Sequence, residues 1–212
     1  MREVRRAADR FLTVAAGLRT WHSFSYGAHY DPDNVGFGAL QAINVEHVSP
    51  GAGYEAHRHA DVEIVTWVLE GALAHHDTTG ADGVVRPGVA QRLSAGTGVE
   101  HEERNASDTE ALVFVQTMLR SDHAGEPRYA SVEVAGTGLQ DGVDVAAPAR
   151  MLVARLEGDA LELPPAPRSL LHVTRGAVRV DHVELTAGDE LRTDVPVGTL
   201  AGTGEALVWL LS

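Results

Sequence analysis

The chain has 212 residues and no cysteine, so it can hold one large or two small domains but no disulfide, thiolate nucleophile or cysteine-ligated metal. With 17 basic residues, all arginine, against 30 acidic ones, its formal net charge of −13 disfavours direct nucleic-acid binding. No apolar run approaches the ~20 residues that cross a bilayer and no signal-peptide pattern opens the chain, so we expect a cytoplasmic protein without membrane contact.

The pattern along the chain predicts a mostly β protein. No segment sustains helical amphipathicity, so we expect helices to be few and short. They are expected near residues 5–11 and 147–150. The runs 61–69 and 111–118 are rich in β-branched and aromatic residues and are predicted strands. Residues 170–180 resemble two short strands joined near an Arg-Gly pair, so the sequence favours an all-β fold with few short helices.

An internal repeat indicates the architecture. Both copies contain a strand that ends in glycine, a later turn glycine and a closing apolar strand. The matched positions are Gly71 with Gly176, Gly88 with Gly188, and the Glu-Ala-Leu-Val segments that begin at Glu110 and Glu205. Because a closed barrel leaves no free strand edge, we predict two antiparallel jelly-roll β-barrels side by side, with one continuous sandwich as the alternative. The predicted domains are residues 1–122 and 123–212.

Two short pairs of metal-binding residues stand in the first copy. His57 and His59 are two residues apart, and so are His101 and Glu103. Side chains two apart on a strand share a face, so two such pairs on neighbouring strands can converge. Three imidazoles and one carboxylate leave about two of six octahedral positions open, which suits iron(II), manganese or nickel. The sequence therefore predicts a metal centre with room for a substrate.

The motifs around these pairs resemble those of the pirin family. The spacing G-x5-H-x-H-x3-E-x7-G covers 51–71, Arg-Pro-Gly stands at 86–88, and AGTGxxHxExN covers 95–105. The segments 21–40, 63–80 and 126–129 are also similar to family signatures. The likeness covers about residues 1–129, and the remainder is similar only to the degenerate second barrel of the family.

This resemblance implies a bicupin whose metal ligands are His57, His59, His101 and Glu103. The implied metal is iron(II), with manganese, nickel, copper or zinc as alternatives. Several relatives resemble quercetin 2,3-dioxygenases, which open a flavonol ring with O₂ and release carbon monoxide. The implied partners are therefore a small aromatic substrate and O₂, with Glu103 as the catalytic residue that accepts the substrate proton. Because one chain carries both barrels, we expect a monomer.

Three positions depart from the family pattern or from the repeat. Arg58 stands where relatives commonly have proline, and we expect its side chain to point away from the ligand face. The positions of the second copy that match the two histidines are Glu162 and Pro164. The second barrel is therefore predicted to lack a metal site and to have a structural role.

Several candidates are assigned lesser roles. Glu63 is kept as an alternative carboxylate ligand, because it shares strand parity with His59 if the strand is unbroken. His75 and His76 are predicted to be solvated strand residues, with a role behind the ligands as the alternative. The aromatic residues between Trp21 and Phe37 are predicted to be core residues, with a lid over an aromatic substrate as the alternative.

Two other functional hypotheses remain open from the sequence. One is a metal-loaded regulatory protein without enzymatic activity that acts through protein partners. The other is a protein whose metal only stabilises the fold. Turnover of a flavonol distinguishes the enzyme from both.

Overall fold

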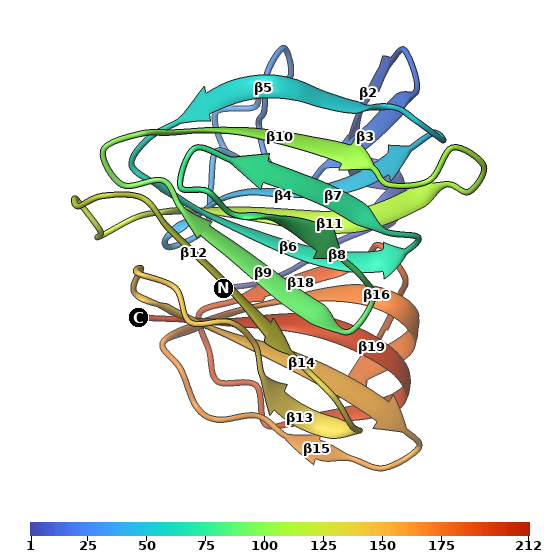
Figure 1. Cartoon of the computed structure of the whole chain (residues 1–212). Coiled ribbons are helices and arrows are strands. Elements are labelled where there is room, and N and C mark those ends of the chain that lie inside the picture. The colour runs from blue at the N-terminus through green and yellow to red at the C-terminus, as the bar shows by residue number, and fades with distance from the viewer. The chain divides into compact units, whose positions relative to one another are not determined.

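The computed structural model describes residues 1–212 and consists almost entirely of β-strands (Figure 1). Its one helical element is the three-residue 3-10 helix η1 (Ala7–Asp9). The all-β prediction is confirmed, whereas the helix expected near 147–150 is wrong. Strand β14 (Ala149–Glu157) begins there, because pairing with the strand at residues 199–211 overrides the helix preference of its alanines. None of the helical structure reaches the length and apolarity needed to cross a membrane.

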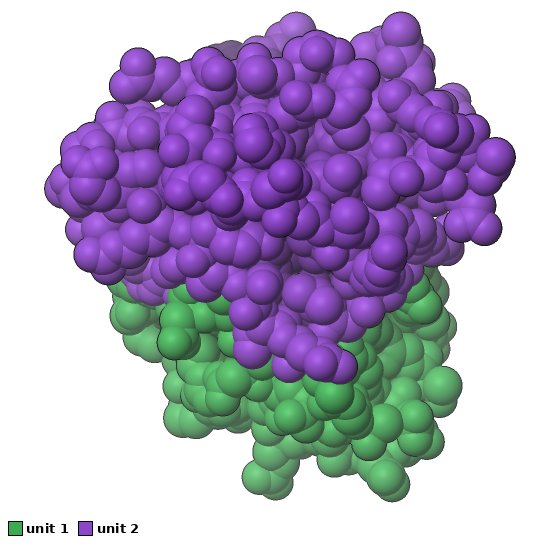
Figure 2. Space-filling model, viewed as in Figure 1, with its two compact units in different colours: residues 1–10, 134–144, 148–212 green, residues 11–133, 145–147 purple.

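The chain forms two compact units (Figure 2). Unit 2 comprises residues 11–133 and 145–147 and contains two antiparallel sheets. The seven-stranded sheet runs in the order β12-β9-β6-β11-β4-β3-β2, with β2 (Phe11–Ala15), β3 (Leu18–His22), β4 (Leu40–Val48), β6 (Val62–Glu70), β9 (Val89–Ser94), β11 (Leu112–Arg120) and β12 (Arg128–Glu133). The four-stranded sheet runs β5-β10-β7-β8, with β5 (Gly53–His59), β7 (Leu73–Asp77), β8 (Asp82–Val85) and β10 (Val99–Asn105).

The apolar side chains of unit 2 form two buried clusters. Val62, Ile64 and Met118 belong to one cluster, and Val68 and Phe114 belong to the other. Val62, Ile64 and Val68 are separated by even numbers of residues on β6, so they share one face of the strand. This alternation gives the seven-stranded sheet its core face and fixes which residues face the other way.

Unit 1 comprises residues 1–10, 134–144 and 148–212 and contains one eight-stranded sheet. Its strands run β1-β18-β16-β19-β14-β13, while β17 pairs with β16 and β15 pairs with β19. The bounds not yet given are β1 (Arg2–Arg5), β13 (Gly138–Asp141), β15 (Leu161–Glu162), β16 (Arg168–Val180), β17 (Val183–Thr186), β18 (Glu190–Thr193) and β19 (Thr199–Leu211). Fifteen buried residues, mostly leucine and valine, form its core.

The repeated glycines occupy equivalent backbone positions in the two units. Gly71 has a φ of 75° and Gly176 a φ of 67°, which is the left-handed region that glycine tolerates best. A Cβ at Gly71 would meet the carbonyl oxygen of Ala111 at 2.5 Å, and one at Gly176 would meet that of Thr203 at 2.3 Å. At Gly176 the chain stays in one long strand, β16, with a register shift beside it. The prediction of two short strands there is therefore wrong, because a bulge absorbs the glycine without ending the pairing.

Candidate metal centre

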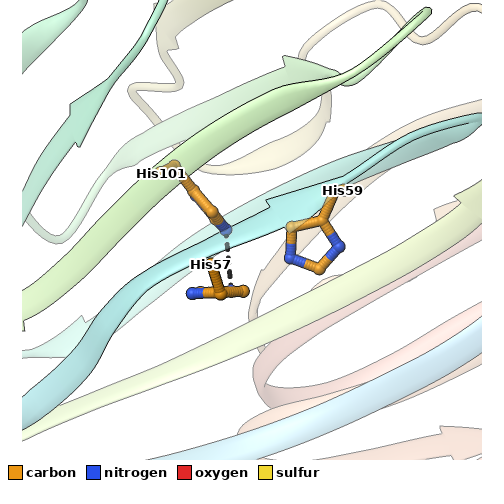
Figure 3. Close-up of side chains that lie close together, drawn as sticks. All are labelled: His57, His59 and His101. Atoms are coloured by element: carbon orange, nitrogen blue, oxygen red, sulfur yellow. Dashed lines mark hydrogen bonds between the residues drawn. The ribbon is translucent and has the colours of Figure 1, made fainter.

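Three of the four predicted ligands lie together on two neighbouring strands of unit 2. His57 and His59 come from β5, and His101 lies opposite His57 in the antiparallel register of β10. The three rings converge, with His57 and His101 joined through their Nε2 atoms at 3.0 Å (Figure 3). One nitrogen of each ring lies within 4.8 Å of the others. The strand alternation predicted from the sequence thus places all three imidazoles on one face.

The chemistry of these imidazoles fits a metal ion. Two ligand nitrogens bound at right angles to one ion at about 2.1 Å lie about 3 Å apart, which is the separation between His57 and His101. The Nε2 atom of His59 is buried without a hydrogen-bond partner. Burial lowers the pKa of His59 to about 4 and that of His101 to about 3, and His57 adds to both shifts. At neutral pH both rings are therefore uncharged, which is the form that binds metals.

Glu103 is adjacent to this cluster but belongs to a second group. It forms a candidate ligand set with His75 and His101, again with one atom of each within 4.8 Å. Its side chain is buried, Oε2 accepts a hydrogen bond of 2.7 Å from Gln116, and Oε1 has no partner. Burial raises the pKa of Glu103 to about 7, partly opposed by the Gln116 hydrogen bond. His101 is therefore the residue shared by both groups.

His75 lies in the site, a position that the sequence allowed only as the alternative. The prediction that it is solvated is wrong, because it lies opposite Glu103 in the register of β7 with β10 and is buried. Its Nε2 is 2.8 Å from Oδ2 of Asp77, and its ring centroid lies 5.6 Å from that of His101. Its neighbour His76 points outward with a side chain that is 69% exposed, as predicted. Strand alternation required one of the pair to be buried, but did not show which.

Glu63 lies outside both candidate ligand groups. It is fully buried and accepts hydrogen bonds from Ser94 at 2.7 Å and Ser121 at 2.6 Å. Glu63 is predicted to share a strand face with His59 if the strand is unbroken. The strand is broken, because β5 ends at His59 and Asp61, with a φ of 57°, forms a turn before β6. The alternative ligand is thus a structural carboxylate, while Arg58 is exposed as expected.

A cavity of about 440 Å³ opens beside the imidazoles within unit 2. Its wall includes His57, His59 and Glu103, together with Tyr26 and Met118. Of the aromatic residues near the amino end, Phe24 is a buried core residue, but Tyr26 lines this cavity. Its size and mixed lining are those of a site for a small molecule, and its position gives such a molecule access to the imidazoles.

An all-β fold with clustered imidazoles beside a cavity defines a metal-binding, cupin-like protein. The family model described as Pirin matches residues 2–119, more than half of the chain. The chain therefore belongs to the Pirin family.

Individual relatives agree with this assignment. A Mycobacterium bovis protein named "Putative quercetin 2,3-dioxygenase Mb0187c" is 40% identical over 98% of this chain and 93% of its own length. The Escherichia coli "Quercetin 2,3-dioxygenase" is 41% identical over 59% of this chain and 55% of its own length. The crystal structure of YhhW from Escherichia coli matches with a TM-score of 0.93 and 30% identity, over 100% of this chain and 98% of that one. A further structure shows that bacterial pirin in complex with nickel(II), with a TM-score of 0.92.

Proposed function

We propose that this chain is a mononuclear, metal-dependent dioxygenase that opens the ring of a flavonol or related polyphenol with O₂. Its metal is held by His57, His59, His101 and Glu103, with iron(II) as the first choice. The observation that carries the proposal is the cluster of three imidazoles beside a cavity of small-molecule size. The names of the relatives and the nickel complex of a bacterial pirin support it.

Both the charge state and the positions of the proposed ligand residues favour metal binding. His59 and His101 are held neutral by burial, so they need not lose protons to bind an ion. Facing strands fix the positions of His57 and His101 before any ligand arrives. When bound there, the ion would supply Lewis acidity and redox capacity beside the cavity. The cavity would hold the two reactants in contact beside these imidazoles.

Glu103 is suited to move the proton of the substrate. A flavonol must lose the proton of its 3-hydroxyl before the ring reacts with O₂. In the metal-free chain burial raises the pKa of Glu103 to about 7, so this carboxylate holds a proton more readily than an exposed one and is suited to accept that proton and later return it. The hydrogen bond from Gln116 holds Oε2, which leaves Oε1 as the oxygen that would face both the ion and the substrate. The balanced reaction converts flavonol and O₂ into the depside ester and carbon monoxide.

The direct test uses the protein loaded with iron(II). Wild-type protein should consume O₂, release carbon monoxide and bleach the long-wavelength absorbance of quercetin. His59→Ala should abolish all three, because it removes a ligand. His76→Ala is the matched control, since it removes an exposed histidine two strands away in the same sheet and should keep full activity.

Each outcome decides between the functional hypotheses. Full activity in His59→Ala contradicts the assigned site. A metal-loaded wild type that turns over no flavonol contradicts the enzyme and favours the non-enzymatic alternative. Elemental analysis of protein purified without added metal identifies the ion, and loss of activity on replacing iron with zinc would show that redox capacity matters.

A further inference from the structure

A second carboxylate, away from the predicted ligands, lies in the wall of the cavity. Glu46 is on β4 and is 3% exposed. Its Oε2 accepts a hydrogen bond of 2.5 Å from Oγ1 of Thr20 and another of 2.6 Å from Oη of Tyr54. Both bonds end on Oε2, and Oε1 accepts none. Glu46 therefore presents one fixed oxygen and one free oxygen.

A local irregularity in β5 places Tyr54 where it can hold Glu46. His57 lies opposite His101, but Tyr54 lies opposite Glu103, so β5 has an extra residue between these pairs. Without this bulge, Tyr54 and His57 would face opposite sides of the strand, because they are three residues apart. With it, both line the cavity. Because of the bulge, one strand supplies both the tyrosine that contacts Glu46 and two histidines of the cluster.

Glu46 is not neutralised by any cation. Its hydrogen-bond partners are two hydroxyl groups, and it takes part in no ion pair. Burial raises the pKa of Glu46, although the hydrogen bonds from Thr20 and Tyr54 oppose the shift. Oε1 is open to the cavity, so a ligand that displaces water from it must donate a hydrogen bond or leave the acceptor unpaired, at a cost of about 1–3 kcal/mol. Because Glu46 faces the same cavity as Glu103, that donor can come from a ligand seated at the metal.

We propose that Glu46 is the specificity residue of this cavity, and that Oε1 accepts a hydrogen bond from a hydroxyl of the substrate remote from the one at the metal. The inference rests on the proposed function and narrows its substrate class to aromatic compounds with at least two hydroxyl groups. A site with a buried acceptor discriminates strongly against an analogue that lacks the matching hydroxyl, because the acceptor then stays unpaired. Thr20 and Tyr54 act as positioning residues, since they hold the carboxylate at the cavity wall.

The test compares two flavonols with different hydroxyl content. Quercetin carries hydroxyl groups on all three rings, whereas 3-hydroxyflavone carries only the 3-hydroxyl. Glu46→Gln keeps the shape and one acceptor for Thr20 and Tyr54, but it turns an amide N–H group toward the cavity. We expect the KM for quercetin to rise about 10-fold or more, as for loss of a charge-assisted hydrogen bond. The removed charge also helps to raise the pKa of Glu103, so any change in kcat should be the same for both flavonols. The KM for 3-hydroxyflavone should change less than about 2-fold.

Two further variants serve as a control and as a second test. Glu63→Gln is the matched control, because Glu63 is an equally buried carboxylate of the same unit that lies outside the cavity. It should not separate the two flavonols. Tyr54→Phe keeps Glu46 but removes one of its donors, so it should show the same substrate dependence at smaller size. That variant carries the test if Glu46→Gln fails to fold.

Anaerobic binding separates this inference from the proposed activity. We would measure Kd for both flavonols with nickel-loaded wild type and Glu46→Gln under argon. Quercetin binding that weakens selectively in the variant supports the role of Glu46 even without turnover, which would overturn only the enzyme. Equal losses for both flavonols, or no loss, overturn the role of Glu46 even in an active dioxygenase. Absence of flavonol binding by the wild type overturns both.

Discussion

Two buried glutamates, one in each unit, have opposite electrostatic surroundings. Glu103 of unit 2 accepts one hydrogen bond, from the neutral amide of Gln116, and burial raises its pKa to about 7. Glu190 of unit 1 is surrounded by cationic and imidazole groups. Glu103 has no cationic partner and one oxygen without a hydrogen bond, whereas both oxygens of Glu190 are paired.

The surroundings of Glu190 show what a structural carboxylate looks like in this chain. Arg10 lies 3.0 Å from its Oε1, Arg192 lies 3.0 Å from its Oε2, and His172 lies 3.2 Å from Oε1. Burial alone would raise the pKa of Glu190, but the hydrogen bond with His172 and the charges of Arg10 and Arg192 hold it well below its ordinary value. Its oxygens are occupied by protein groups, so they have nothing to offer a ligand.

Burial by itself therefore does not identify a functional acid. Both side chains are at least 98% buried, yet one has a free oxygen and a pKa near neutrality and the other has neither. A carboxylate kept without its full set of partners is the one suited to bind an ion or accept a proton.

The largest expected effect is on stability in unit 1. Glu190→Gln leaves Arg10 and Arg192 buried without their counter-charge, which should lower the free energy of unfolding by about 3–5 kcal/mol. Urea denaturation measures this loss. Metal stoichiometry at 20 °C should be unchanged in the fraction that remains folded. A variant as stable as the wild type would show that the ionic cluster is not structural.

A smaller effect of opposite sign is expected at Glu103. In metal-free protein the folded state holds this proton up to a pKa of about 7, whereas the unfolded state releases it near 4.5. Ionisation therefore costs stability as pH rises from about 4.5 to 7, by about 3 kcal/mol in total. Glu103→Gln should match the wild type at pH 4 and exceed its free energy of unfolding at pH 8, while binding metal more weakly.

The contributions of His59 and His101 are the same in both proteins and cancel in this difference. A pH profile in which wild type and Glu103→Gln run parallel from pH 4 to 8 would contradict the raised pKa of Glu103. It would also remove the argument that this carboxylate exchanges a proton with the substrate.

His75 sharpens the assignment of the metal ligands. If His57, His59 and His101 hold the ion and His75 only supports His101, His75→Gln should weaken metal affinity about 10- to 100-fold without abolishing it. Isothermal titration with nickel(II) measures the change. Complete loss in His75→Gln, with affinity retained in His57→Ala, would move the centre to the group of His75, His101 and Glu103.

The smallest effect is expected at an exposed ion pair of unit 1. Arg150 and Asp141 are joined at 2.7 Å, but both side chains are more than half exposed. Asp141→Asn should therefore change the free energy of unfolding by less than about 1 kcal/mol. A loss of stability comparable to that of Glu190→Gln would show that burial does not explain why the ion pairs of Glu190 contribute more than the exposed pair.

The features that the sequence predicted correctly depend on local periodicity. Alternation along a strand is sufficient to place His57 and His59 on one face, and the repeat correctly equates Gly71 with Gly176. These signals need only two residues that are close in sequence or two copies of one pattern. They predicted the all-β fold and the cluster of three histidines.

The missed features depend on register and on contacts between distant segments. His75 enters the site through its pairing opposite Glu103, and Tyr54 through a bulge that reverses its face. Glu46 meets Tyr54 only because β4 and β5 line one cavity, and Arg10 meets Glu190 across 180 residues of sequence. No single-strand pattern contains this information, because register and bulges are settled by the packing of the whole unit.

The most direct test of the account is anomalous diffraction from a crystal of the nickel-loaded protein. We predict a single anomalous peak about 2.1 Å from one nitrogen each of His57, His59 and His101, with an oxygen of Glu103 bound to the same ion. A peak that contacts His75 in place of His57 and His59, or no peak in unit 2, would contradict the account.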